Sequence, residues 1–452
     1  MEALAEGTLG PRMIAPLSGA RTTALLDQLA DTECPALTAR RARRSERSGA
    51  AQDPIVWMQA RGSNVVDAEG NRYVDLSAGF GAAAIGHAHP RVVSAVQTQA
   101  PVLMHALGDL HPSQVKIELL ARLAKLAPFP EARVMLGSSG ADAVEAALKT
   151  ALLYTKRPGV IAFTGGYHGL AHAPLALCGY NEVFREPFAA QLNPHVAFAP
   201  YPRADLPLTA ALDAVSAAFE RVPAGVGAVV AEPMLGRGGV VMPPQGFLRG
   251  LSELCRVRGA LLVVDEVMTG LHRTGPLFRS VADGCVPDLL CIGKALGGGM
   301  PISACLGRAE ILRAWGDPDH EALHTATFFG HPIACAAALA ALDVLHDEGL
   351  GARADKSGEH LLSRLRELQA RHACVREVRG TGLLVGVELH PVRPAIALLL
   401  TRMLLERGYI VVPAAADASV VSLTPPLSIT IEQLDGFVAA LDACLDAVAE
   451  LP

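Results

Sequence analysis

Short apolar runs alternate with helical patterns through the middle of the chain, and this alternation is the strongest constraint on its fold. Helical patterns are expected at about 113–127, 141–156, 208–221 and 245–258. The apolar runs cover 133–136, 160–163, 228–231, 261–264, 289–292 and 303–306. Such alternation is typical of parallel strands joined by crossover helices. We therefore expect an α/β fold whose mostly parallel sheet is wrapped by helices.

The two chain ends have a different pattern. A polar turn at Gly70 separates two short alternating runs, which predicts a hairpin, and Pro90 then opens a helix. Beyond about residue 340, a helix at 395–407 and short strands at 409–412 and 419–423 indicate a smaller α+β domain. We expect an extension over 1–50, the first part of a small domain over 51–95, a large domain over 96–340, and the rest of the small domain over 341–452.

The composition limits the kinds of partner. The 452 residues carry a net charge of −6 without a broad basic field, which favours a small-molecule enzyme over a nucleic-acid-binding protein. Nine cysteines without paired short spacings indicate reduced thiols and a cytoplasmic location. We find no secretory signal and no apolar stretch of about 18 residues, so no membrane association is expected. His87 and His89 make a poor metal pair, and we expect no metal.

Lys294 follows an apolar run and enters a glycine-rich turn, and Asp265 closes the preceding buried run. A lysine at such a place can be desolvated, which lowers its pKa and makes its amine a Schiff-base nucleophile. An aspartate at the end of a neighbouring strand can hold a pyridine nitrogen protonated. Together they suggest pyridoxal phosphate chemistry. The alternative for Lys294 taken alone is a solvated charge at a strand end.

A strand, a turn of small residues and a helix follow one another at 133–143, with Ser139 in the turn. Backbone amides at the start of such a helix suit a phosphate, although a turn capped by Ser139 is the alternative. The turn is neither a nucleophile elbow nor a P-loop. Tyr167 lies on a glycine-rich loop and could stack on one face of a flat cofactor, with Val267 on the other.

The order of these parts resembles the class III family of pyridoxal phosphate-dependent aminotransferases, of the aspartate aminotransferase fold, also called fold type I. The resemblance covers about residues 55–430. It implies a large domain around a seven-stranded, mostly parallel sheet and a small α+β domain built from both chain ends. The motifs that carry it are Gly86-His-Ala-His-Pro90, Ser139-Gly-Ala-Asp-Ala143, Tyr167-His-Gly169, Glu232-Pro233, Asp265-Glu-Val-Met-Thr-Gly270, Arg273-Thr-Gly275, Gly293-Lys-Ala-Leu-Gly-Gly-Gly299 and Thr327-Phe-Phe-Gly-His-Pro332.

The resemblance also implies roles for individual residues. Lys294 would hold the cofactor as a Schiff base and later move a proton between substrate and cofactor. Asp265 would pair with the pyridinium nitrogen. Thr327 would reach the cofactor phosphate from the second subunit of a homodimer. The other implied cofactor contacts are Ser139, Gly140 and Ala141 at the phosphate, Tyr167 and Val267 on the ring, and His168 and Glu232.

Three positions depart from the family pattern. Met268 stands where many members have a glutamine that binds the ring oxygen of the cofactor. Members acting on ornithine or 4-aminobutyrate resemble one another in a glutamate and a distant arginine, and here Arg237 and Ser422 stand at those places. We hypothesise that Arg237 binds a carboxylate or other anion on the substrate. Solvent exposure of Arg237 is the alternative.

The resemblance implies an aminotransferase that moves an amino group from an amine or ω-amino donor to an oxo-acid acceptor in two half-reactions. A racemase, aminomutase or decarboxylase of the same fold is the alternative, because the fate of their shared carbanion depends on an angle that the sequence does not show. A non-catalytic, cofactor-binding module is a third hypothesis, and the intact Lys294 and Asp265 disfavour it.

Overall fold

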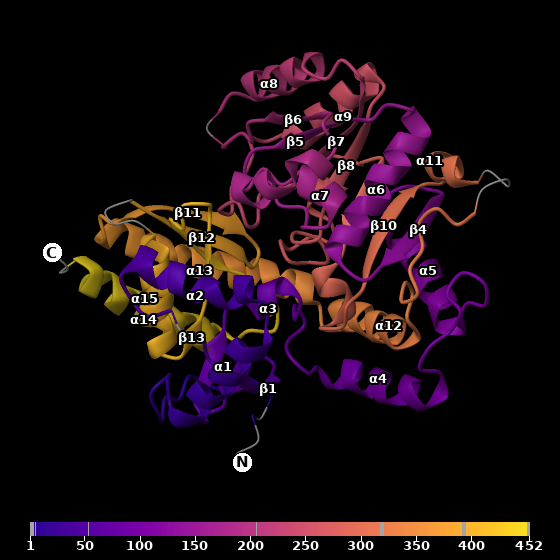
Figure 1. Ribbon diagram of the computed structural model, residues 1–452. Coiled ribbons are helices and arrows are strands. Elements are labelled where there is room, and N and C mark those ends of the chain that lie inside the picture. The colour runs from indigo at the N-terminus through magenta and orange to yellow at the C-terminus, as the bar shows by residue number, and fades with distance from the viewer. Residues whose placement is uncertain are drawn as a thin grey trace. The chain divides into compact units, whose positions relative to one another are not determined.

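The structure is a computed structural model, and it describes residues 4, 6–52, 54–204, 206–316, 321–390 and 395–449, without the side chains of 36–39 and 41. The chain forms two compact units. One consists of residues 90–352, and the other combines residues 1–89 with residues 353–452 (Figure 1). The domain boundaries expected from the sequence remain a prediction.

Residues 90–352 contain a seven-stranded sheet. In spatial order its strands are β4 (Ala132–Gly137), β10 (Ser303–Arg308), β9 (Leu289–Ile292), β8 (Leu261–Asp265), β7 (Val226–Ala231), β5 (Gly159–Phe163) and β6 (Val196–Ala199). β10 runs antiparallel to both of its neighbours, and the other neighbouring pairs are parallel. The expected mostly parallel, seven-stranded sheet is therefore confirmed.

Helices cover both faces of this sheet. Ala162 of β5 belongs to the apolar cluster under α6 (Gly140–Thr155), whereas the ring of the next residue, Phe163, packs against Phe247 of α9 (Phe247–Arg258). Successive strand residues point to opposite faces, so α6 and α9 lie on opposite sides. The remaining helices of this unit are α4 (Pro90–Val102), α5 (Gln114–Leu126), α7 (His172–Ala176), α8 (Leu208–Glu220), α10 (Arg279–Ala282), α11 (Ala309–Leu312) and α12 (Pro332–Asp347), with 3-10 turns η1 (Glu182–Phe184), η2 (Glu186–Gln191), η3 (Lys294–Gly297) and η4 (Arg313–Trp315).

The other unit joins the two chain ends through two four-stranded sheets. One has the order β1 (Trp57–Arg61), β2 (Asn64–Asp67), β3 (Arg72–Asp75) and β13 (Tyr409–Ile410). The second has the order β11 (Val375–Thr381), β12 (Leu384–Leu389), β15 (Val420–Leu423) and β14 (Val412–Ala414). Its helices are α1 (Ala20–Thr32), α2 (Pro35–Ser48), α3 (Ala78–Gly81), α14 (Ile396–Glu406), α15 (Ile431–Ala449) and α13 (Leu350–Arg371) from Arg353 onward.

The first 50 residues contain structure that the sequence pattern did not predict. Helices α1 and α2 lie there, and α2 packs on α14. Gln52 donates a hydrogen bond from Nε2 to the carbonyl oxygen of Leu398 at 3.1 Å. α2 begins with Pro35 at its first position and ends at Gly49 in the left-handed conformation (φ 66°). The helix is strongly polar, so it lacks the apolar stripe by which a helix is recognised.

No helix in the described part of the chain is both long enough and apolar enough to cross a lipid bilayer.

Candidate active site

The predicted site residues gather at one edge of the seven-stranded sheet. The strands β4, β5, β7, β8 and β9 all end there, and we call this the carboxyl edge. Ligands of open α/β sheets bind at such an edge. Asp265 is the last residue of β8, and the other predicted residues leave their strands within a few positions: Ser139 after β4, Tyr167 and His168 after β5, Glu232 after β7, and Lys294 after β9.

Asp265 is held by two donors. Its Oδ2 accepts a hydrogen bond from Nδ1 of His168 at 2.8 Å, and its Oδ1 accepts one from the backbone amide of Val267 at 3.0 Å. Both Asp265 and His168 are buried. Burial alone would lower the pKa of His168, but the hydrogen bond and charge of Asp265, with the charge of Glu232, raise it above its ordinary value. The two hydrogen bonds therefore hold the Asp265 carboxylate in a fixed orientation.

Lys294 begins the turn η3 and keeps a partly exposed side chain. Dense protein around its amine lowers the pKa of Lys294, and the positive charge of Arg237 acts in the same direction, whereas Asp265 and Glu232 oppose it. A lowered pKa leaves more of the amine unprotonated and nucleophilic. The lysine is thus both reachable and activated.

Glu232 connects two loops of the site. Its Oε1 accepts a hydrogen bond from the amide of Tyr167 and its Oε2 one from the amide of Gly236, both at 3.0 Å. The side chain is buried; burial raises the pKa of Glu232, and the charge of His168 and the two amides partly offset that effect. Both carboxylate oxygens are therefore engaged in holding Tyr167 and the turn that carries Arg237.

The start of α6 has free hydrogen-bond donors. Ser139 caps the helix by accepting from the amide of Asp142, and the Asp142 carboxylate accepts from the amides of Ser138 and Ser139 at 2.9 Å each. The amides of Gly140 and Ala141 then find no acceptor among the described residues. Two unpaired amides at a helix N-terminus suit an anion such as phosphate.

Two glycines let the neighbouring loops approach α6. A Cβ added at Gly140 would lie 2.8 Å from Cγ1 of Val267. A Cβ at Gly169, whose φ is +112°, would lie 2.7 Å from the Cβ of Ala141. The Val267 loop and the Tyr167-bearing loop therefore pack directly on the helix start. The free amides, the activated lysine and the fixed carboxylate fit a phosphorylated pyridine aldehyde.

Arg237 lies among aromatic rings, of which the sequence predicted only Tyr167 as a site residue. Its guanidinium carbon is 4.4 Å from the ring centre of Tyr167, 4.8 Å from that of Tyr180 and 5.5 Å from that of Phe184. Tyr180 and Phe184 carry no recognisable motif. A cluster of aromatic residues soon after the Tyr167 loop was the available signal.

Three other positions singled out in the sequence take no part in the hydrogen bonds described above. Thr327 is exposed in the turn before α12 and makes no hydrogen bond with the residues above. Met268 is partly buried beside Gly236. Ser422 lies buried on β15, opposite Gly386 of β12, in the unit that joins the chain ends.

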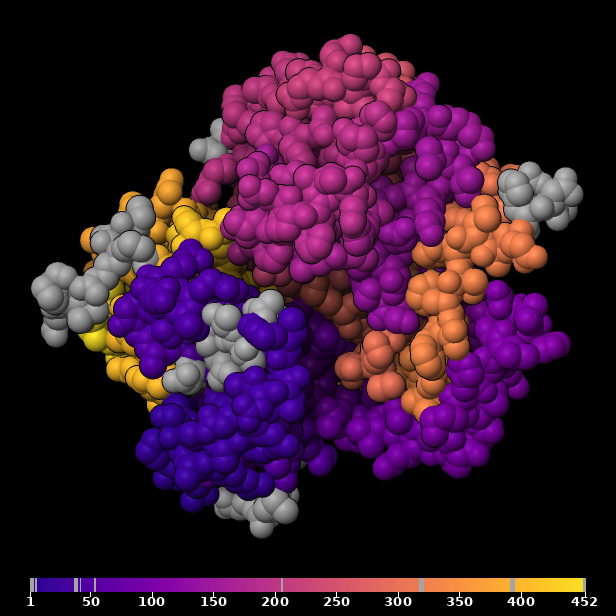
Figure 2. Space-filling model, in the orientation of Figure 1, coloured from indigo at the N-terminus to yellow at the C-terminus, as the bar shows by residue number. Residues whose placement is uncertain are grey.

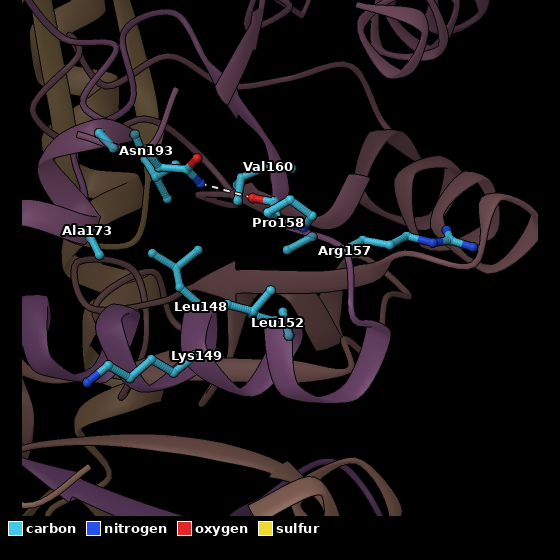
Figure 3. Close-up of a pocket in the computed structure, with 13 residues that line it drawn as sticks. Leu148, Lys149, Leu152, Arg157, Pro158, Val160, Ala173 and Asn193 are labelled. Carbon is cyan, nitrogen blue, oxygen red and sulfur yellow. Dashed lines mark hydrogen bonds between the residues drawn. The ribbon is translucent and has the colours of Figure 1, made fainter. Parts of the chain in front are cut away.

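A separate cavity of about 160 Å³ lies between α6, β5 and α7. Leu148 and Leu152 face it, whereas the side chains of Lys149 and Arg157 extend away (Figure 3). Its lining is mainly apolar and includes none of the residues at the carboxyl edge. We therefore place the active site at the carboxyl edge and not in this cavity.

Solved structures share this architecture. An amine transaminase from an uncultivated Pseudomonas species, in its pyridoxal phosphate-bound form, superposes with a TM-score of 0.81 at 29% sequence identity, over 88% of this chain and 96% of that one. The fold and the carboxyl edge define a fold-type I pyridoxal phosphate enzyme.

Proteins of similar sequence identify the family to which the chain belongs within this class of enzymes. The family model for class III aminotransferases matches residues 47–445. The chain is 36% identical to the 5-aminovalerate aminotransferase DavT of Pseudomonas aeruginosa, over 88% of this chain and 94% of that protein. It is 40% identical to the acetylornithine aminotransferase of Mycobacterium tuberculosis, again over 88% and 94%. The chain belongs to the class III aminotransferases, its cofactor is pyridoxal phosphate, and its substrates are an amino donor and an oxo-acid acceptor.

Proposed function

We propose that Lys294 is the residue that bonds covalently to the cofactor, and that the enzyme moves an amino group from an amine or ω-amino donor to an oxo acid in two half-reactions. The observation that carries this proposal is the lowered pKa of the Lys294 amine at the carboxyl edge, within electrostatic reach of Asp265. Lys294 is the described lysine whose pKa shift and position both suit an amine nucleophile.

Each side chain around Lys294 has its own proposed role in the reaction. Bound pyridoxal phosphate supplies condensation with amines and uptake of electrons into its ring. Lys294 would take a proton from the donor carbon and pass it to the cofactor carbon within the first half-reaction, and would carry a proton in the opposite direction in the second. Asp265, oriented by His168, keeps a negative charge at the ring nitrogen. The amides of Gly140 and Ala141, beside Ser139, hold the phosphate, while Tyr167 and Val267 enclose the ring.

Two observations support a donor that carries an anionic group. The relatives are named for 5-aminovalerate and acetylornithine, each of which bears a carboxylate. Arg237 supplies a positive charge within electrostatic reach of Lys294. We propose that Arg237 takes the place of the missing arginine at position 422. Because Ser422 lacks a charge, 4-aminobutyrate and ornithine are disfavoured as donors.

We further propose a homodimer in which Thr327 completes the phosphate site of the second subunit. Thr327 is exposed, and the neighbouring Phe328 exposes 61% of its surface. Large apolar side chains are also exposed on and after α4: Val102, Leu103, Met104, Leu107 and Leu110. The part of the chain around α4 and α5 forms the violet surface at the lower right of Figure 2. An exposed apolar surface of this kind is typical of a subunit interface.

A cytoplasmic location is proposed from the cysteines. All nine are free thiols, and most of them are buried. Buried free thiols without disulfides are typical of reducing compartments.

The absorbance spectrum of the holoenzyme tests the reaction. Addition of ω-amino acids, diamines or α-amino acids without an acceptor should replace the yellow band by a near-ultraviolet band for the true donor class. In Lys294→Ala the rate of this change should fall by at least about a thousandfold. Lys149→Ala, at a partly buried lysine paired with Glu145, is the control. Product formation while the wild-type yellow band persists would instead favour a racemase, aminomutase or decarboxylase.

A further inference from the structure

The guanidinium of Arg237 is surrounded by Tyr167, Tyr180 and Phe184, which we call the aromatic cage. The three rings contact one another as well as the cation. Tyr167 and Tyr180 meet edge to face with ring centres 6.3 Å apart, and Tyr180 and Phe184 are tilted at 6.1 Å. Cation–π contacts attract the charge to the ring faces, and the attraction is stronger where water is excluded. The cage therefore holds the guanidinium in one place.

The cage leaves the hydrogen-bond donors of Arg237 unused. Among the described residues, none forms an ion pair or a hydrogen bond with its guanidinium, although the side chain is partly buried. Ring faces attract the charge, but they do not replace the oxygen acceptors that the five N–H groups require. A planar carboxylate matches two of these N–H groups at once. Arg237 thus offers a positive charge and guanidinium N–H groups that have no acceptor among the described residues.

The backbone around Arg237 is also fixed. Leu235 and Val241 exchange two backbone hydrogen bonds, of 2.9 and 3.1 Å, so Arg237 sits in a tight turn. The amide of Gly236 is bound by Glu232, which also binds the amide of Tyr167. One buried carboxylate therefore connects the Arg237 turn to the first ring of the aromatic cage.

We propose that Tyr180 and Phe184 are positioning residues which fix Arg237 as a single, stationary receptor for a carboxylate carried by both the amino donor and the oxo acceptor. This inference rests on the proposed function of the carboxyl edge. Glu232 binds the amides of both Gly236 and Tyr167, and the Arg237 guanidinium lies 4.4 Å from the Tyr167 ring centre, which places Arg237 at the carboxyl edge. The substrate class is then amino acids and oxo acids that present a carboxylate at a fixed distance from the reacting group. Neutral amines gain nothing from Arg237.

Calorimetry on the holoenzyme tests the receptor without catalysis. The probes are glutarate, which has carboxylates but no reacting amine or oxo group, and its neutral diamide. Glutarate should bind to the wild type and lose at least about tenfold in affinity in Arg237→Met. The diamide should bind both proteins equally. Equal glutarate affinity in the two proteins would overturn the proposal.

Kinetics test the positioning role of the aromatic cage. Tyr180→Leu and Phe184→Leu should raise KM for 5-aminovalerate about three- to tenfold and leave the half-reaction with butylamine unchanged. Tyr180→Phe, which retains the ring, should restore the wild-type KM. Phe188→Leu is the matched control, because Phe188 is exposed on η2 and its ring contacts His172 instead of Arg237.

The outcomes distinguish a failure of the positioning role from a failure of the proposed function. Equal losses for 5-aminovalerate and butylamine, or a Phe188→Leu effect as large as that of Phe184→Leu, would overturn the positioning role. If the wild type converts neither compound nor any other amine, the proposed function fails, and the glutarate affinities still decide whether Arg237 is a carboxylate receptor.

Discussion

The Nδ1 atom of His168 lies 2.8 Å from Oδ2 of Asp265, and the two residues expose only 3% and 4% of their surfaces. The amide of Val267 occupies the other carboxylate oxygen. Asp265 is therefore oriented before any ligand arrives, and we propose that His168 acts on the reaction through Asp265.

His168→Leu removes one of the two donors to Asp265. We expect kcat/KM to fall about 10- to 100-fold, as is typical when the partner of a site residue is lost. His168→Asn can place an amide N–H near the position of Nδ1 and should retain most of the activity. The measurement is steady-state kinetics at saturating cofactor. Equal losses in the two variants would show that the hydrogen bond has no role.

The stability contributed by His168 should depend on pH. Because the folded-state pKa of His168 is raised, its contribution is fully present below its ordinary pKa of about 6.5 and is lost as the pH rises through the folded value. The difference in unfolding free energy between wild type and His168→Leu should therefore shrink as the pH rises above about 6.5. Urea denaturation of the apoprotein measures it. Glu232, whose pKa is also raised, contributes a pH dependence of the same sign, and a Glu232→Gln background removes it from both proteins.

Gly140→Ala should destabilise the protein by about 1–3 kcal/mol, because the new methyl group would overlap Val267. In Gly140→Ala/Val267→Ala the overlap is relieved, and a double-mutant cycle should show a favourable coupling of about 1 kcal/mol. Gly10→Ala is the control, since no atom lies within 4 Å of the added Cβ there. Additive effects in the cycle would contradict the close packing of Val267 on α6.

Glu266→Ala should cost about 3 kcal/mol of unfolding free energy. The Glu266 carboxylate is buried and accepts four hydrogen bonds: from the amide and hydroxyl of Ser280 at 2.7 Å each, from the Thr269 hydroxyl at 2.8 Å and from the Arg279 amide at 3.0 Å. Its loss leaves these donors buried without an acceptor. Glu253→Ala breaks an exposed ion pair with Arg256 and should have a much smaller effect, because solvent screens such a pair. Similar costs for the two variants would refute this role.

The elements that the sequence predicted are those in which buried positions leave a clear pattern of apolar residues. β9 is buried at every residue and was predicted with its observed limits, 289–292. α5, α6, α8 and α9 begin and end within about two residues of expectation. β6 was missed, because Val-Ala-Phe-Ala is short and only partly buried. α1 and α2 were missed because polar helices depend on contacts that no periodicity records.

The candidate site was only partly predictable. Parallel strands bring their ends together, so Asp265 and Lys294 could be expected at one edge. The aromatic cage could not be predicted, because the cluster of aromatic residues after the Tyr167 loop is visible in the sequence but nothing in the spacing of Tyr180 and Phe184 relates them to Arg237. The hydrogen bonds that Glu232 accepts from two backbone amides could not be predicted from the sequence either, because any buried glutamate could accept such bonds.

The reversed direction of β10 affects how the Lys294 turn assembles. β9 and β10 are antiparallel neighbours, so the connection over 293–302 returns directly along the adjacent strand. Parallel neighbours such as β7 and β8 meet only after a helix and its loops have been ordered between them. Closing a short loop loses less chain entropy and proceeds faster than closing a long one. Lys294 therefore follows a pair of strands, β9 and β10, that can form early during folding. The segments that are distant in the sequence and complete the surroundings of Lys294 must pack onto this pair afterwards.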